Sequence, residues 1–350
     1  MTMTKTIIVS LHPMPLLRGV ARSSLAACLA VVALAASASE PRELKLGSDE
    51  WPPFTGSVEQ QRAALDLVHT ALDRAGIAAA TTIHDWKKVE IDIRRGDLDG
   101  SAAMWRDEIR EKHLLFSAPY LENRLILIGA RDSDVTAARM AELAGKRVAA
   151  VGHYAYGEDI QNAQGVLFVA SHNDQDSLDK LLAGDVDYIL VDELVAQHLV
   201  TYQPDEAAAN LEIGMKPLAR RTLHFAIRRD IPNADKIIAR FNAEIPKLQA
   251  DGTYARILNV GWIRVDVDGD GLYELVPFGE SVGQMPPGRV YDVFGELPEA
   301  DEPDEKQRVL IGGDIYKGWD AIPDRYKLPP SAAGGDTSFK YGTTMLTFKF

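Results

Sequence analysis

The 350-residue chain is predicted to be an α/β protein, because short apolar runs typical of strands alternate with helical segments along residues 42–262. Short links join these segments, which favours βα units and parallel sheets. Several aromatic and charged residues follow predicted strands, at the carboxyl edge where such sheets bind ligands. Beyond residue 262 the pattern changes to short β-like runs broken by Pro and Gly.

The first 38 residues predict a secretory signal peptide. They contain Lys5, Arg18 and Arg22 but no acidic residue, and an apolar run precedes the small-residue site "ASA" that ends at Ala38. "LAAC" resembles a lipoprotein box, so lipidation of Cys28 is the alternative; most of the apolar run follows Cys28, which favours plain cleavage. Cys28 is the only cysteine, so a chain cleaved after Ala38 can form no disulfide.

Strands and helices can be assigned in order from their period and their end signals. "WPP" interrupts regular structure after the first strand, and glycines end the helices at 59–76, 85–96 and 235–252. Strands are predicted at 42–49, 98–104, 123–130, 145–152, 186–191 and 222–229, and helices at 59–76, 85–96, 106–116, 177–184, 192–200 and 235–252.

Composition and missing motifs narrow the function. The hydrophobic content of 46% is sufficient for a large core, and the formal net charge of -13 argues against nucleic-acid binding, which needs a basic face. The three positive charges of residues 1–38 would leave -16 after cleavage. No nucleophile-elbow, phosphate-loop or C-x-x-C motif is present, and the histidines lack metal-ligand spacing.

Six ordered landmarks carry a family resemblance over residues 43–262. They are "GSDEWPPF", "DWKKVEIDIRRGDLDG", "FSAPY", "LAGKRVAAVGHYAYG", "LLAGDVDYILVDELVA" and "FNAEIPKLQADGTYARIL". In this order the chain resembles the bacterial periplasmic solute-binding proteins of the polar amino-acid type. The resemblance implies a type II periplasmic-binding fold: a first lobe at 39–126 and 222–262, a second lobe at 127–221, and crossing strands near 123–129 and 223–229. Residues 263–350 would then form a small β-rich extension.

The resemblance also implies ligand-binding residues. Arg110 stands six residues before Phe116 of "FSAPY", where the family binds the ligand carboxylate; a guanidinium can form two parallel hydrogen bonds there. Asp192 would take the ligand ammonium and Trp51 would stack on its apolar part. The loop after residue 151 would contribute contacts from the second lobe, through His153, Tyr154 and Tyr156.

Other residues near Arg110 bear on the ligand. Arg106 lies one helical turn before Arg110, next to Trp105. We expect both arginines to face an anionic ligand across the cleft, with Trp105 packing beside the ligand; the alternative is that Arg106 pairs with nearby acids on a solvated face. The family often has hydroxyl residues where this chain has Ala102, Ala103 and Trp105. The site therefore has fewer side-chain donors and more apolar surface, which suits a ligand with one carboxylate and a larger or apolar body. Trp86, ahead of a predicted helix, is assigned to packing.

The function implied by the resemblance is non-enzymatic binding of an amino acid or related carboxylate in the periplasm. The partner would be an ABC transporter permease or a sensor, the protein would be a monomer, and no cofactor would be required. Some relatives resemble cyclohexadienyl dehydratases, so an enzyme on the same fold is an alternative; Glu50 beside Trp51 would be its general acid.

The extension begins with a predicted calcium loop. Asp266, Asp268 and Asp270 alternate, the Leu272 carbonyl stands at position seven and Glu274 at position nine, a spacing that can wrap a hard cation with oxygens. An EF-hand would need a glutamate at position twelve, where this chain has Pro277, so the loop resembles shorter extracellular calcium loops instead. The alternative is an acidic turn without metal.

Overall fold

The computed structural model describes residues 42–57, 61–152, 154–279, 282, 290–295 and 307–327. The predicted signal peptide, His153 and the last of the β-like runs, at 338–350, which we expect to be an ordinary strand, lie outside these residues. Within the described ranges, no helix is long and apolar enough to span a bilayer.

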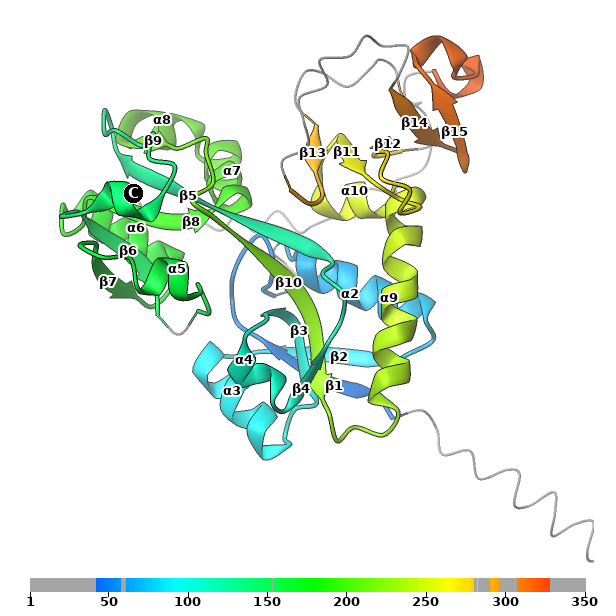
Figure 1. The fold of residues 1–350 in the computed structure, drawn as a ribbon, viewed down its shortest axis with the longest axis horizontal. Coiled ribbons are helices and arrows are strands. Elements are labelled where there is room, and N and C mark those ends of the chain that lie inside the picture. Colours follow the sequence, from blue (N-terminus) through cyan, green and yellow to red (C-terminus); the bar gives the residue numbers. More distant parts are fainter. Residues whose placement is uncertain are drawn as a thin grey trace, which may run out of the picture. The chain divides into compact units, whose positions relative to one another are not determined.

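The first lobe contains the segments on either side of the crossing strands (Figure 1). Its elements are β1 (Leu44–Ser48), α2 (Ala63–Arg74), β2 (Ala79–Ile83), α3 (Trp86–Arg95), β3 (Gly100–Trp105), α4 (Glu108–Glu111), β4 (Leu114–Phe116), α9 (Ala234–Ala250) and α10 (Thr253–Leu258). Helix α3 begins and ends as its sequence predicts: the Asp85 side chain accepts from the Lys87 N–H at 3.0 Å, and Gly96 ends it with φ of 88°.

The second lobe is formed by the segment between the crossing strands. Its elements are η1 (Met140–Leu143), β6 (Arg147–Val151), α5 (Glu158–Gln161), β7 (Leu167–Ser171), α6 (Asp174–Leu182), β8 (Tyr188–Asp192), α7 (Glu193–Tyr202), α8 (Pro204–Asn210) and β9 (Leu211–Ile213). Strands β2 and β7 and helix α8 were not predicted, because β2 and β7 have little apolar alternation and α8 is short and polar.

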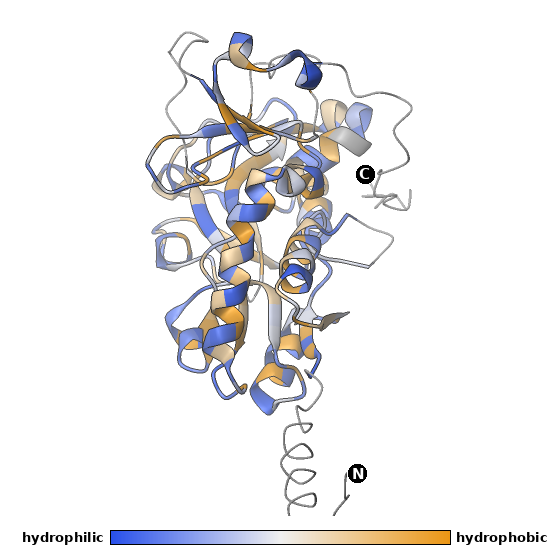
Figure 2. Ribbon diagram, turned by 90° about the vertical axis from the view of Figure 1, so that its right-hand side faces the viewer, coloured by the Kyte–Doolittle hydropathy of each residue, from blue (hydrophilic) through white to orange (hydrophobic). Residues whose placement is uncertain are grey.

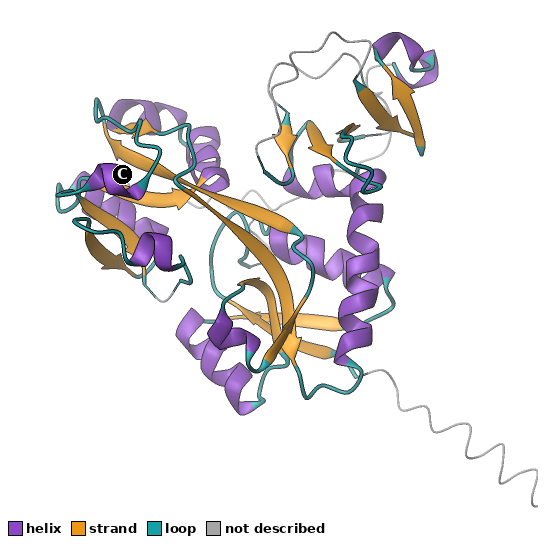
Figure 3. Cartoon of the chain, in the orientation of Figure 1, coloured by secondary structure: helices purple, strands orange, loops and turns teal. Residues whose placement is uncertain are grey.

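Two long strands, β5 (Leu121–Ala130) and β10 (Ala219–Arg228), connect the lobes (Figures 1 and 3). They pair antiparallel from Ala219↔Leu125 to Leu223↔Leu121, so the crossing lies two to four residues earlier than the predicted ranges. Strands β1, β2 and β3 pair in parallel, as do β6, β7 and β8, but β10 and β5 join these groups antiparallel. The sheets are therefore mixed rather than wholly parallel.

The helix predicted at 106–116 is wrong beyond its first turn. Asp107 accepts hydrogen bonds from the N–H groups of Ile109 and Arg110, which starts α4, but α4 ends at Glu111. Leu114–Phe116 then form β4, which pairs antiparallel with β10. Pairing with a buried strand overrides the local helical tendency of this segment.

The core lies between the sheets and the helices. Leu67, Val68 and Leu72 of α2 are fully buried, as is Phe241 of α9, which packs near Phe225 with ring centroids 5.0 Å apart. Figure 2 shows hydrophobic and hydrophilic residues in turn along the helices, as expected for elements with one buried face.

The extension forms a second sheet. Its strands are β11 (Trp262–Val265), β12 (Glu274–Pro277), β13 (Tyr291–Asp292), β14 (Arg308–Ile311) and β15 (Asp314–Lys317), in the order β13-β11-β12-β14-β15, followed by the 3-10 turns η3 (Trp319–Ala321) and η4 (Asp324–Tyr326). Ile263, Val276 and Val293 of the extension belong to the same hydrophobic core as the two lobes. The extension is therefore packed against the binding fold and is not a free tail.

Candidate functional site

An aromatic cluster joins the two lobes at the carboxyl ends of their strands. Trp51 follows β1, Trp105 ends β3, and Tyr154 and Tyr156 follow β6 of the second lobe. Ring centroids lie 5.6 Å apart for Trp51–Tyr154, 5.5 Å for Trp105–Tyr154 and 5.4 Å for Trp105–Tyr156. Phe54 packs on Trp51 at 4.4 Å. The structure thus brings together four residues that the sequence analysis assigned to ligand binding.

Two aspartates add polar contacts between the lobes. The Tyr154 hydroxyl of the second lobe donates to Asp49 of the first at 3.0 Å, and Asp174 of the second lobe accepts from the Trp51 side chain of the first. Burial raises the pKa of Asp49 from 3.8 to about 6, and the Tyr154 hydrogen bond opposes this rise. Burial also raises the pKa of Asp174 from 3.8 to about 7, against the hydrogen bond from Trp51.

The space left between these side chains is small. The cavity measures about 30 Å³ and is lined by Asp49, Trp51, Trp86, Ala103, Met104, Trp105, Arg110, Tyr154, Ala155 and Leu223. A single water needs roughly 10–15 Å³ by this measure, so the cavity holds one or two waters and no amino acid. The protein's own aromatic side chains therefore fill the cleft, and a ligand can enter only when the lobes separate.

Arg110 lines this cavity, but its charge already has partners. Its guanidinium donates to Glu90 at 2.8 Å and to the Trp105 carbonyl at 2.8 Å, and it lies over the Trp86 ring at 5.4 Å. Asp107 is 3.4 Å away. Because Arg110 is only 6% exposed, these contacts hold the guanidinium in one orientation beside the cavity. The role of Arg110 at a ligand carboxylate stays a prediction.

Arg106 does not join the site. Its side chain is 56% exposed and forms an ion pair with Glu111, and it is not among the residues that line the cavity. The structure therefore does not bring Arg106 to the cavity beside Arg110, and a contact between Arg106 and the ligand stays a prediction. The alternative, a pair on a solvated face, describes Arg106.

Asp192 lies at the end of β8 and starts α7. Its two carboxylate oxygens accept from the backbone N–H groups of Leu194, at 2.7 Å, and Arg124, at 2.8 Å. Burial raises its pKa to about 7 although these hydrogen bonds oppose the rise. Asp192 is not among the residues that line the cavity, so its role at the ligand ammonium stays a prediction, whereas its capping role is visible.

We expect Asp192→Ala to lower the free energy of unfolding by about 2 kcal/mol or more. The substitution removes a helix cap and leaves a buried backbone N–H without its acceptor. Urea unfolding followed by circular dichroism measures this difference. Asp205→Ala, in the exposed first turn of α8, is the matched control and should change stability little. Equal stability of the two variants would contradict a capping role for Asp192.

Two residues that line the cavity, Asp49 and Trp86, and one that contacts its lining, Asp174, were missed or assigned differently from the sequence. Asp49 stands directly before Glu50, the acid considered for an enzyme, but Glu50 is exposed and Asp49 lines the cavity. Asp174 follows the unpredicted strand β7. Trp86 was assigned to packing, yet it lines the cavity, and its buried indole N–H has no hydrogen-bond partner among the described residues. His153 lies outside the described residues.

The predicted metal loop has a defined conformation. Asp266 accepts from the N–H groups of Gly269, at 2.7 Å, and Gly271, at 3.0 Å. Oxygens of Asp266, Asp268 and Glu274 lie within 4.8 Å of one another, which fits a single hard cation. Glu274 is fully buried, its pKa is raised chiefly by burial, and one of its oxygens accepts no hydrogen bond of good geometry.

Arg308 of β14 also lies at this loop. Its guanidinium is 2.8 Å from Asp270 and 2.8 Å from Glu274, and 3.7 Å from Asp268. Asp270 therefore turns to Arg308 and to the Leu272 N–H rather than to the other acids. This arginine neutralises part of the negative charge of the loop. That the Leu272 carbonyl is a metal ligand stays a prediction.

Two α/β lobes that meet at a small aromatic-lined cavity, joined by two crossing strands, define a hinged solute-binding protein. The family model of the bacterial extracellular solute-binding proteins, family 3, matches residues 44–263, more than half of the chain. The chain belongs to this family, and the resemblance found in the sequence is confirmed.

Particular relatives support this assignment. The chain is 25% identical over 240 residues to ABC transporter arginine-binding protein 1 of Escherichia coli (strain K12), covering 67% of this chain and 95% of that protein. Among solved structures, an arginine 3rd transport system periplasmic binding protein from Legionella pneumophila is 21% identical with a TM-score of 0.52, covering 62% of this chain and 98% of its own. The GluR0 ligand-binding core from Nostoc punctiforme, in complex with L-glutamate, is 18% identical with a TM-score of 0.52 and coverages of 62% and 97%. At these identities the two structures show the shared fold.

Proposed function

We propose that this chain binds an amino acid with a cationic side chain in the periplasm and delivers it to an ABC transporter permease. The observation that carries the proposal is the charge at and beside the cavity: Asp49 lines it, and Asp174 of the opposite lobe accepts a hydrogen bond from Trp51, which also lines it. Arg110, the arginine among the lining residues, is already paired with Glu90. A cationic ligand would supply the missing positive charge. The name of the arginine-binding relative supports the same ligand class.

The side chains suggest how such a ligand would be held. Arg110 is placed for the carboxylate, with the unpartnered Trp86 N–H as an additional donor beside it. Trp51, Trp105 and Tyr154 offer the faces of their aromatic rings to a cation. The quadrupole of each ring attracts the cation to that face. On opening, Asp49 and Asp174 lose Tyr154 and Trp51 as partners, and the ligand cation takes their place. Closure then buries the ligand between the lobes.

A ligand screen tests the proposal directly. Thermal unfolding of the chain without residues 1–38 would be measured with L-arginine, L-lysine, L-glutamine, L-glutamate and simple organic acids. A ligand at 100 times its dissociation constant stabilises by about 2.7 kcal/mol, so a true ligand produces a clear shift. We expect L-arginine or L-lysine to give the largest shift. A shift with L-glutamate alone would contradict a cationic ligand.

Binding without turnover fits the cavity better than the dehydratase alternative. That alternative assigned the general acid to Glu50, and Glu50 is exposed and does not line the cavity. The sensing alternative uses the same cleft and differs only in the partner that recognises the closed form. Recovery of unchanged ligand after incubation distinguishes binding from catalysis.

The loop at 266–274 is proposed to bind calcium as a structural ion of the extension. The three clustered carboxylates and the buried Glu274 oxygen support this proposal, and Arg308 provides partial neutralisation when no ion is bound. The ion would join β11 to β12 at their shared turn and would lie away from the ligand.

We expect millimolar calcium to raise the midpoint of thermal unfolding, because extracellular calcium sites are commonly weak, at roughly 10⁻⁴ to 10⁻³ M. Asp266→Asn with Asp268→Asn should abolish the rise, since these two acids supply two of the three clustered carboxylates. Asp320→Asn with Asp324→Asn, which removes the same charge from exposed sites of the extension, is the matched control and should keep it. If calcium does not raise the unfolding midpoint of the wild type at fixed ionic strength, the proposal is contradicted, and the loop is an acidic turn held by Arg308.

A further inference from the structure

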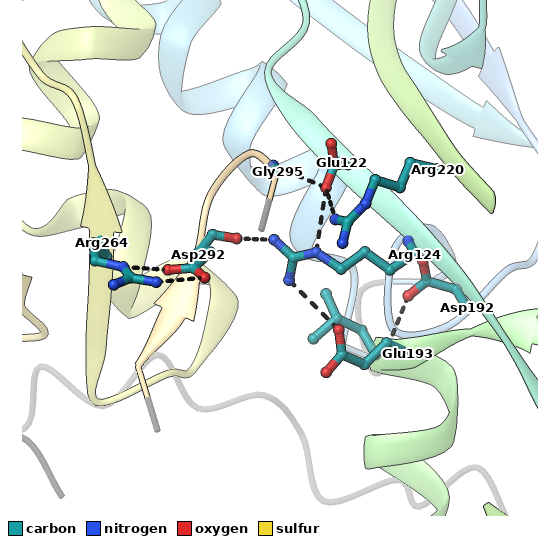
Figure 4. Close-up of polar contacts among 9 residues, drawn as sticks. Glu122, Arg124, Asp192, Glu193, Arg220, Arg264, Asp292 and Gly295 are labelled. Carbon is teal, nitrogen blue, oxygen red and sulfur yellow. Dashed lines mark hydrogen bonds and ion pairs between the residues drawn. The ribbon is translucent and has the colours of Figure 1, made fainter. Parts of the chain in front are cut away.

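A segment of the extension, Tyr291–Gly295, lies against the crossing strands. Figure 4 shows Asp292 and Gly295 of this segment beside Glu122 and Arg124 of β5. The contact lies near residues 121–125, where β5 pairs with β10 and the two lobes are joined. The extension therefore touches the part of the fold about which the lobes would turn.

Arg124 is the centre of this contact. Its side chain is 9% exposed, and its guanidinium donates to the Asp292 carbonyl of the extension and to Glu193 of the second lobe, at 3.5 Å. The same guanidinium lies over the Tyr291 ring, 5.0 Å from its centroid. One buried cation thus connects the extension with the first turn of α7.

Glu122 makes a second contact between the same parts. One of its oxygens accepts from Arg220 of β10 at 2.6 Å, from the Gly295 N–H at 3.1 Å and from Arg124 at 3.2 Å. Glu122 is buried, so this ion pair network is shielded from solvent. The extension is thereby bound to β5 directly and to β10 through Glu122.

The segment is itself anchored to the first lobe through its own sheet. Arg264 of β11 holds the Asp292 carboxylate with two hydrogen bonds, at 2.6 Å and 2.9 Å. The Val293 N–H donates to the Arg264 carbonyl, and the Val293 side chain is fully buried. Strand β11 follows α10 after a short link, so the segment moves with the first lobe, whereas Glu193 moves with the second.

We propose that residues 291–295 form a hinge brace, which favours the closed arrangement of the lobes by linking the extension to the second lobe through Arg124. Separation of the lobes would move Glu193 away from Asp292, and Arg124 cannot then keep both partners. Arg124 is buried, so losing one partner without replacement is costly. The brace thus favours the closed arrangement in which the aromatic side chains fill the cleft.

A cleft held closed without ligand binds that ligand more weakly, because apparent affinity falls with the fraction of molecules that are competent to bind. The extension would in this way set the ligand concentration at which the protein responds. A partner that displaced the segment would raise affinity without touching the cleft. The brace can be tested without any ligand, so its test is independent of the proposed function.

Distance measurement between spin labels tests the brace. Beyond Cys28 the chain has no cysteine, so Lys87→Cys in the first lobe and Ala183→Cys in the second, both exposed, give one labelled pair in the protein without residues 1–38. The pair is measured in the ligand-free protein. Arg264→Gln, which removes the two hydrogen bonds from the Arg264 guanidinium to the Asp292 carboxylate and so loosens the segment, should shift the distance distribution towards longer distances. Arg325→Gln, an arginine of the extension far in sequence from the brace, is the matched control and should leave the distribution unchanged.

A second variant keeps the test decisive if the first variant does not fold. Glu193→Gln weakens the brace from the side of the second lobe and leaves the extension intact, so it should produce the same shift. If Arg264→Gln does not fold, Glu193→Gln alone decides the question. Folded variants with distance distributions identical to that of the wild type would overturn the proposal.

Discussion

Arg110→Ala should weaken L-arginine binding by about a hundredfold and leave the fold intact. A hydrogen bond to a charged group contributes roughly 1.5–3 kcal/mol, and each 1.4 kcal/mol is a tenfold change in affinity. Arg110 is the cation that lines the cavity, and its guanidinium is already oriented by Glu90 and the Trp105 carbonyl. Isothermal titration calorimetry with L-arginine measures the loss.

Arg106→Ala is the matched control for this experiment. It removes the same charge four residues away, from an exposed side chain that pairs with Glu111. We expect its affinity for L-arginine to stay within about twofold of the wild type, since exposed ion pairs contribute little. Equal losses in the two variants would show that the charge of α4, rather than the placement of Arg110, matters for binding. Unchanged affinity in Arg110→Ala would remove Arg110 from the site.

The affinity for L-arginine should rise by at least about tenfold between about pH 5 and about pH 8. A ligand that needs an ionised carboxylate loses about tenfold in affinity for each pH unit below the pKa of that group. Burial raises the pKa of Asp49 to about 6 and that of Asp174 to about 7, whereas the ligand guanidinium stays charged throughout this range.

The affinity rises with pH, and does not fall, because the two aspartates release protons when the lobes separate. In the closed arrangement both aspartates bind protons more tightly than an exposed carboxyl with a pKa of 3.8 does. Rising pH between about 4 and 7 therefore destabilises the self-filled cleft and favours opening. The same ionisation attracts the cationic ligand, so both effects increase affinity with pH.

Asp49→Asn with Asp174→Asn should remove most of this pH dependence and weaken binding at pH 8. Asp185→Asn, an exposed acid of the second lobe, is the matched control and should keep the wild-type profile. Calorimetry at several pH values, at one ionic strength, gives the profiles. A double variant with the wild-type slope would exclude these two carboxylates as the groups that titrate.

Local signals were sufficient for much of the fold. The helical period and the cap residues Asp85 and Gly96 defined α3 within one residue at each end. The family landmarks placed the binding segments in the right order, because each landmark combines a strand end with the turn that follows it. Trp51, Trp105 and Tyr154 could be assigned to the cleft for the same reason: strand ends on one edge of a sheet must meet.

Other features depended on contacts between distant segments. Leu114–Phe116 became a strand only because β10 offered an edge, and β5 and β10 joined the parallel groups antiparallel, which no local pattern indicates. Arg106 and Arg110 share one sequence context, yet Arg110 turns towards Glu90 and Trp86 while Arg106 points to solvent.

The sequence by itself determined the family, the α/β class and the aromatic residues of the cleft, because these depend on periodicity and on ordered motifs. Only the tertiary structure decided that Asp49 lines the cavity and Asp174 binds Trp51 beside it, that the cleft is filled by its own side chains, and that the extension reaches Arg124 at the hinge. Burial and pairing across long sequence separations arise when the whole chain packs, so a local stretch of sequence cannot encode them.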